Sequence, residues 1–113
     1  MADTSFLDWP FLEPKHKALH AALEAWASDN LRHVDHDNTD PTCQALVAAL
    51  GAAGILKHTG VNATFPQIDV RSLCLIRETL ARHDGLADFA FAMQSLGTMA
   101  ISLFGSGTQK ADW

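Results

Sequence analysis

The apolar segment from Leu86 to Phe104 limits what this chain can fold into more than any other feature. It contains nineteen residues and a single charge, Asp88. About twenty apolar residues are enough to cross a bilayer, so a membrane span has to be considered. Four polar residues are spread through its middle and end: Gln94, Ser95, Thr98 and Ser102. No Trp, Arg or Lys stands directly before it and only Lys110 follows, so we expect a helix buried in a larger protein and no membrane partner.

The composition is that of one globular domain. The chain has 113 residues, of which 48% are hydrophobic and 19% charged, a balance typical of folded rather than disordered proteins. The net charge is −5, and the eight Lys and Arg residues are scattered along the chain. Nucleic acid binding depends on clustered basic residues, and no predicted helix has a basic face. We therefore expect no nucleic acid partner, which also excludes a helix-turn-helix DNA binder.

The spacing of apolar residues is helical along most of the chain, and no strand pattern stands out. A first helix is predicted at about 13–31, with Pro14 in its first turn. In the second, Asp40 is expected to be the N-cap and Pro41 the first helical residue, with Gly54 as the stop. The segment 55–68 is expected to be irregular because it contains several helix breakers.

Three more helices complete the prediction. Asp69 is a good N-cap for a helix that stops at about 83–85, where Gly85 is expected to end it. The apolar helix follows and contains Gly97, a residue type that often marks close packing or approach to a ligand. Thr108 to Trp113 has the pattern of a helix's first turn. A chain that stops one turn into a helix is expected to be truncated.

Several titratable residues could form sites, but a simpler role is favoured for each. His16 and His20, four residues apart, could share a metal ion with ligands from the loop 33–37, although solvated histidines are the expected state. Glu78 and Arg82 are expected to form an exposed ion pair. Three other expectations concern charged groups: His83 and Asp84 stand at a helix end in capping roles, and Glu24 has no visible partner.

The two cysteines, Cys43 and Cys74, fall within apolar helical patterns. We expect reduced, buried thiols rather than a disulfide or a redox pair, as in a cytoplasmic protein. The N-terminal residues include early acids and no apolar core flanked by basic residues, so no secretory signal is expected. The chain also contains no phosphate-binding glycine loop, metal-ligand cysteine set or nucleophile motif.

The end of the chain contains the run S-L-G-x-x-x-I-x-x-x-G-x-x-x-Q-K-x-x-W. Its members are Ser95-Leu96-Gly97, Ile101, Gly105, Gln109-Lys110 and Trp113. This run resembles the first domain of the acyl-CoA dehydrogenases. Residues 69–88 are similar to the helix and turn before it, 46–56 to the helix leading into an L-G-x-x-G turn, and 11–31 to the opening helix. The resemblance covers nearly the whole chain.

The resemblance implies an all-α fold, an orthogonal bundle of about five helices over residues 1–113. In the family, a middle β-domain and a C-terminal four-helix bundle follow this domain, and FAD lies mainly between them. We expect both to be absent here, with the domain truncated at its C-terminal end. A carboxylate of the C-terminal part removes the substrate's α-proton, and electron-transferring flavoprotein usually accepts the electrons. The resemblance therefore assigns no catalytic, flavin-binding or metal-binding residue to this chain.

The resemblance also implies a role for the apolar helix, which in the full enzyme walls the acyl end of the substrate pocket. The positions expected to face the substrate are Phe89, Ala92, Met93 and Leu96. They are three or four residues apart, so a helix can present them on one side. The alternative for each of them is a core residue that touches no ligand.

Two functions follow. The first is the N-terminal domain of an FAD-dependent oxidoreductase of fatty acid metabolism, inactive by itself, whose apolar helix is covered by other domains and by subunits of a homo-oligomer. The second is a free-standing helical interaction module, with the apolar helix as a permanent homo-oligomer interface. An apolar helix left in water costs several kcal/mol at about 25 cal/mol per Å², so both functions require that something cover it.

Overall fold

A computed structural model describes residues 2–112. The helices of this range, in chain order, are η1 (Ser5–Asp8), α1 (Pro14–Asn30), α2 (Thr39–Ala52), η2 (Ile55–Thr59), α3 (Val70–His83), α4 (Gly85–Phe104) and α5 (Gly107–Asp112), where η denotes a 3-10 helix. No strand occurs within residues 2–112, so the predicted all-α bundle of about five α-helices is confirmed. Trp113, predicted to continue the last helix, lies outside the described residues.

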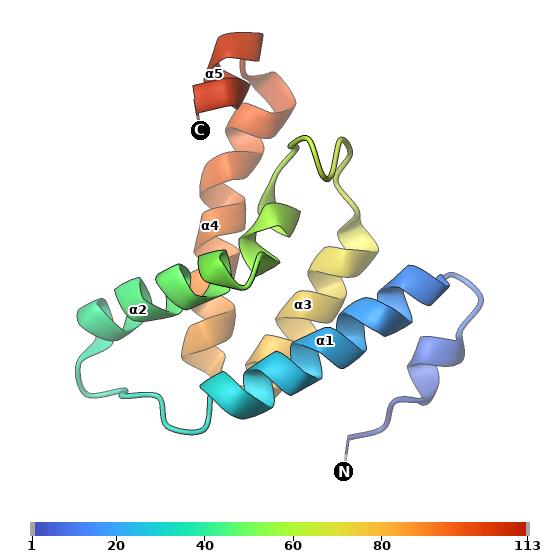
Figure 1. Cartoon of the computed structure of the whole chain (residues 1–113), viewed down its shortest axis with the longest axis vertical. Helices are drawn as coiled ribbons and strands as arrows, with labels where there is room; N and C mark the ends of the chain where they lie inside the picture. Colours follow the sequence, from blue (N-terminus) through green and yellow to red (C-terminus); the bar gives the residue numbers. More distant parts are fainter. Residues whose placement is uncertain (1, 113) are drawn as a thin grey trace.

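Helix α3 lies between α1 and α4, and α2 crosses α4 on the other side of the bundle (Figure 1). The η2 segment packs against both α4 and α2, so it joins these two helices. The molecule is flat, with extents of 44 × 41 × 18 Å. The C-terminal end of α4 and the short α5 extend beyond the other helices (Figure 1).

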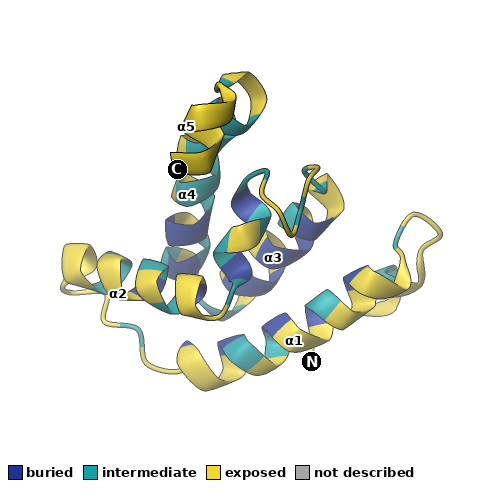
Figure 2. Cartoon of the chain, turned by 45° about the horizontal axis from the view of Figure 1, so that its top comes forward, coloured by how far each residue is buried: buried dark blue, intermediate teal, exposed yellow. Residues whose placement is uncertain are grey.

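One hydrophobic core joins α1, α2, η2, α3 and α4. Its largest fully buried apolar side chains are Leu23, Leu50, Ile76, Leu80 and Phe91. Figure 2 shows that the buried positions lie along the inner sides of α1 and α3 and in the N-terminal half of α4. The core therefore ends well before the C-terminus of α4.

The N-terminal ends of α1 and α3 are joined by a hydrogen-bonded pair. The backbone N–H of Glu13 donates to Nδ1 of the fully buried His16 at 2.9 Å, so the other ring nitrogen carries the proton. That nitrogen, Nε2, donates to Asp69 at 2.8 Å. Asp69 is the predicted N-cap of α3, confirmed by the bond that it accepts from the N–H of Arg71. One carboxylate thus caps α3 and holds α1.

The C-terminal end of α3 is held by two further carboxylates. Glu24 of α1 accepts hydrogen bonds from Arg82 and from His83, the latter at 3.1 Å. Asp84 caps α4 through the N–H groups of Leu86 and Ala87. Its second oxygen pairs with His36, from the loop between α1 and α2, at 2.7 Å. The predicted capping role of Asp84 is thereby confirmed.

Three predictions about side chains were wrong. His16 and His20 are buried in the α1–α3 interface, not solvated, because both lie on the face of α1 that packs on α3. Glu24 has partners, which come from a helix distant in sequence. Cys74 is exposed because the buried face of α3 is formed by Ser72, Leu75, Ile76, Thr79 and Leu80, and Cys43 of α2 is half-buried. The predicted Glu78–Arg82 ion pair is present at 3.2 Å.

Some helix boundaries also differ from prediction. Helix α2 begins at Thr39 with Asn38 as N-cap, so Asp40 and Pro41 lie inside its first turn. Residues 55–59 form η2 rather than an irregular segment. Gly85 is the first residue of α4 and does not stop α3, because Asp84 already ends one helix and caps the next. Gly54 is a stop as predicted, with a φ of 75° that favours glycine.

Replacing Asp69 by Ala is expected to lower the free energy of unfolding by about 2–3 kcal/mol, because it removes an N-cap and leaves the buried His16 without its partner. Chemical denaturation followed by circular dichroism measures this. The exposed Asp37 provides the matched control, and Asp37→Ala is expected to change stability by no more than about 0.5 kcal/mol. Equal effects of the two substitutions would contradict the assigned role.

The same substitution is expected to alter the acid dependence of stability. Burial raises the pKa of Asp69, but hydrogen bonds from His16, Lys15 and Ser72 outweigh it and hold the pKa well below the ordinary 3.8. The folded state therefore binds fewer protons than the unfolded state as the pH falls through 3.8. The stabilisation by ionised Asp69 is fully present above pH 3.8 and is lost as the pH falls from there toward the lower pKa of the folded state. Asp69→Ala is expected to remove this pH dependence.

Candidate functional site

The side of α4 that faces its own domain is apolar in the N-terminal half and polar in the C-terminal half. In the N-terminal half, Ala87, Ala90 and Phe91 are buried in the core. In the C-terminal half, the side facing the domain is polar. The hydroxyl of Thr98 donates to the carbonyl oxygen of Thr59 at 2.9 Å, and Ser102 accepts from the N–H of Val61 at 3.0 Å. Two of the four polar residues that argue against a membrane span thus bind backbone groups at and just after the end of η2.

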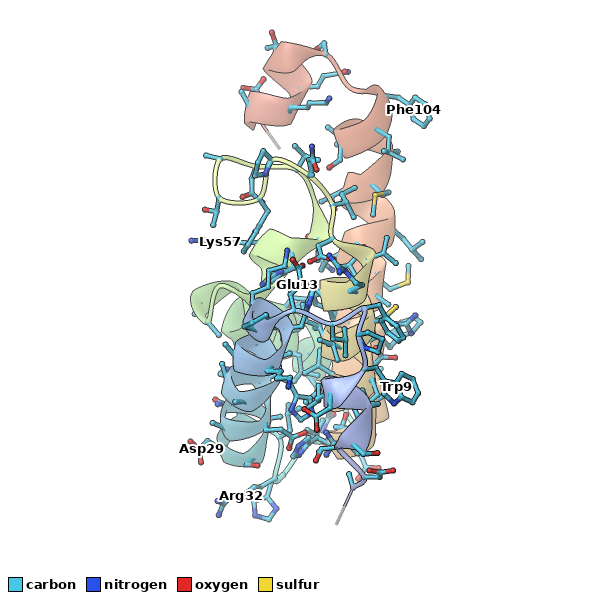
Figure 3. The ribbon with its side chains drawn as sticks, turned by 90° about the vertical axis from the view of Figure 1, so that its right-hand side faces the viewer. Trp9, Glu13, Asp29, Arg32, Lys57 and Phe104 are labelled. Atoms are coloured by element: carbon cyan, nitrogen blue, oxygen red, sulfur yellow. The ribbon has the colours of Figure 1, made fainter. Side chains whose placement is uncertain are left out.

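The opposite side of α4 carries an exposed apolar row, here called the α4 stripe. It consists of Phe89, Met93, Leu96, Ala100 and Leu103, spaced four, three, four and three residues apart. The exposed fractions are 57% for Phe89, 44% for Met93, 69% for Leu96 and 57% for Leu103. Phe104, 87% exposed, follows it and points away from the body (Figure 3). This spacing places the whole stripe along one line of the helix.

The N-terminal end of the α4 stripe forms one wall of a groove between α4 and α2. The α4 wall includes Phe89 and Met93, and the α2 wall consists of Cys43, Gln44 and Val47. The groove has a volume of about 400 Å³, and no charged side chain lines it. Such a groove suits an apolar chain, because no charge would have to be stripped of water to admit it.

The structure brings together two of the four predicted substrate-facing residues. Phe89 and Met93 share the groove, whereas Leu96 lies further along the α4 stripe. Ala92 is half-buried beside them. Whether any of the four contacts a ligand is untested, so their role stays a prediction. Sequence reasoning missed the α2 wall, since only the fold brings residues 43–47 next to α4.

An ion pair fixes the start of α4 next to this groove. Arg77 donates two hydrogen bonds to Asp88, at 2.9 and 2.8 Å. The Asp88 carboxylate raises the pKa of Arg77 above its ordinary value. The only charge of the apolar segment is thus used to hold α4 against α3. Within residues 2–112, no group of three His, Cys, Asp or Glu side chains is placed to hold a metal ion.

A second groove, apolar in its middle and polar at one end, lies between α1 and α2. Two adjoining cavities of about 550 and 360 Å³ open along these helices, and Trp26 lines both. The facing wall includes Ala45 and Ala49 of α2 and Ala53 directly after it, and the larger cavity continues to the polar loop with His33 and Asp35. Helix α1 packs on α3 rather than on α2, so the groove is left between two helices that follow each other in sequence.

A comparison with protein families decides the relationship. The family model described as acyl-CoA dehydrogenase, N-terminal domain, matches residues 13–113. The chain belongs to this family. A comparison with curated proteins gave no match.

The acyl-CoA dehydrogenase motif of the C-terminal residues has a structural basis. Gly105 ends α4, and a Cβ there would lie only 2.5 Å from the carbonyl oxygen of Ile101. Gly97 is exposed and a Cβ would meet nothing within 4 Å, so its own domain does not require a glycine there. Gln109 caps α5 by accepting from the N–H of Ser106 at 2.9 Å. Trp113 lies outside the described residues.

Helix α4 is the one helix within residues 2–112 that is long and apolar enough to cross a membrane. Its mean hydropathy is 1.3, and 22% of its apolar window is buried. Length and composition alone are weak evidence for a span, since core helices pass the same test. The hydrogen bonds of Thr98 and Ser102 and the ion pair of Asp88 all join α4 to the bundle.

Replacing Leu96 and Leu103 together by Glu is expected to reduce self-association of the chain, because both side chains are more than half exposed. Sedimentation velocity at several concentrations measures the effect. Circular dichroism is expected to show an unchanged helix content, since neither residue belongs to the core. The control is Phe91→Ala on the buried side, which is expected to lower stability by about 3–5 kcal/mol. Unchanged association of the double variant would contradict a role of the α4 stripe in self-association.

Proposed function

We propose that this chain serves as the N-terminal helical domain of an FAD-dependent acyl-CoA dehydrogenase, in which α4 forms part of the wall around the acyl chain. The observation that carries the proposal is the uncharged groove at the N-terminal end of the α4 stripe, inside the region that matches the family. An acyl chain is apolar, so a wall of Phe89 and Met93 would bind it by removing apolar surface from water.

The residues of this chain do not fit FAD on their own. A cavity of about 450 Å³ is lined by the cationic side chains of Lys15 and Arg71. Both are already paired, Lys15 with Asp69 at 3.2 Å and Arg71 with Glu13 at 2.8 Å, so neither is free to bind a flavin phosphate. The family implies FAD in the intact enzyme, and we assign its binding and the removal of the substrate proton to other domains. The role of this chain is to exclude water and to shape the acyl site.

The first test is the coding sequence beyond Trp113. A β-rich region followed by a helical bundle is expected. A stop codon directly after Trp113 would favour the second function. The purified 113-residue chain is expected neither to bind flavin stoichiometrically nor to reduce a dye with acyl-CoA. Stoichiometric flavin and dye reduction in that sample would overturn the assignment of chemistry to other domains.

In the polypeptide that carries all three domains, Phe89→Ala is expected to shift the preference in kcat/KM toward longer or bulkier acyl-CoA substrates. Removing the ring enlarges the groove, and one methylene in an apolar pocket is worth about 10- to 200-fold in discrimination. Steady-state assays with a series of acyl-CoA chain lengths measure this. Leu103→Ala, on the stripe but away from the groove, is the control and should leave the preference unchanged. Identical profiles for Phe89→Ala and wild type would exclude the proposed wall.

The spacing of the α4 stripe also supports the second candidate function, a homo-oligomeric interaction module. Apolar residues four and three apart form the seam by which helices pair in coiled coils. In this function a second copy of α4 covers the stripe, and the Leu96 and Leu103 double variant is monomeric. The intact mass of the native gene product separates the two functions, because only the first requires further domains.

We also propose that the groove between α1 and α2 is the surface offered to electron-transferring flavoprotein in the intact enzyme. A groove with apolar residues around a Trp and polar residues at its end has the composition of a protein interface, with an apolar centre and a polar rim. Trp26→Ala is expected to raise the KM for the acceptor protein at least about tenfold. Activity with a small dye should be unchanged, and Trp9→Ala, outside the groove, is the control. An equal loss with both acceptors would contradict the proposal.

The remaining expectations are proposals of the same kind. The net charge of −5 argues against a nucleic acid partner. A cytoplasmic location agrees with two free cysteines. The contacts of α4 with its own bundle argue for a protein, not a membrane, as the cover of the α4 stripe.

A further inference from the structure

His20 is a buried imidazole with an unsatisfied ring nitrogen. Its exposed fraction is 6%, and its Nε2 atom has no hydrogen-bond partner. The nearest carboxylate oxygen, on Glu24, is 3.7 Å from Nε2, which is too far for a hydrogen bond. His16, one turn earlier, differs because both of its ring nitrogens are bonded. The site therefore accepts a neutral His20 and provides nothing for a second ring proton.

The 3-10 helix η1 covers this histidine through one side chain. The ring of Phe6 meets the ring of His20 edge to face, with centroids 6.1 Å apart and planes at 83°. Helix η1 contains no buried residue. Leu7 of η1 is half-buried, and an exposed ion pair joins Asp8 to Lys17 of α1 at 2.6 Å. Exposed ion pairs add little stability, so η1 is weakly held.

The other groups around His20 are already bound to each other. On α3, Arg82 and His83 donate to Glu24, and Glu78 pairs with Arg82. On α1, Glu24 faces His20 directly, and His16 is bonded to Asp69. On η1, Asp8 is paired with Lys17. A protonated His20 would obtain Glu24 only by taking it from Arg82 and His83, which hold α3.

We propose that η1 is an acid-released latch, which the neutral imidazole of His20 holds against α1 and which opens when that imidazole takes up a proton. Phe6 belongs to a segment without a buried residue, so its departure is a way to bring water to the protonated ring. Burial and, to a lesser extent, Arg82 lower the pKa of His20 below its ordinary 6.5, while Glu78 opposes them. The closed form therefore binds fewer protons than the open form and is disfavoured as the pH falls through and below 6.5.

Hydrogen exchange of the N-terminal peptide tests the latch in the full chain. The N–H groups of Leu7, Trp9 and Leu12 are bonded within this segment and report its opening. After correction for the intrinsic rate, their protection is expected to fall at least about fivefold between about pH 7.5 and about pH 5.5. In His20→Gln the change is expected to be less than about twofold, because glutamine does not titrate.

His33→Gln is the matched control, because His33 is an exposed loop histidine, and it should behave like the wild type. Phe6→Ala should be unprotected at both pH values, and this variant keeps the test valid if His20→Gln fails to fold. Three results would overturn the proposal: protection that does not change with pH in the wild type, a wild-type change of protection with pH in His20→Gln, or any change of protection with pH in Phe6→Ala.

Discussion

The arrangement of this domain depends on carboxylates that hold both ends of α3. Asp69 at one end caps α3 and binds His16 of α1, while Glu24 and Asp84 act at the other end. Each joins segments at least 48 residues apart in sequence. Burial of apolar area drives the helices together without selecting their register, because it has no direction. Charge-assisted hydrogen bonds have direction, and here they fix α1 and α4 against the same helix.

This fixed frame explains how α4 can present an apolar side to solvent. Its N-terminal half is anchored in the core by Phe91, and the pair of Asp88 with Arg77 prevents rotation. Beyond that half, Thr98 and Ser102 hold the helix to η2 by hydrogen bonds. Few apolar contacts with its own domain are needed there, so the outer side of α4 is left exposed.

Local rules predicted much of the fold. Asp69 as an N-cap and Gly54 as a stop follow from short-range chemistry, which a sequence displays directly. The burial of His16 did not follow, because its partner lies 53 residues away and the pairing depends on how α1 crosses α3. For the candidate site, the resemblance to the acyl-CoA dehydrogenases gave four residues of α4, and two of them, Phe89 and Met93, share a groove. The α2 wall required the tertiary fold.

In the C-terminal half of α4, polar residues face the domain and apolar residues face solvent. Selection for folding and selection for function therefore act there on different residues, although they usually act on the same ones. In most domains, replacing a large apolar residue damages folding first, so its functional importance is hidden. Leu96 and Leu103 contribute little to their own core, and folding of the isolated chain would tolerate polar replacements there. A mutational scan scored on abundance would rank these positions as permissive. Under the proposed function, a scan scored on enzyme turnover would not, and the difference between the two maps would outline the surface that α4 offers to a partner.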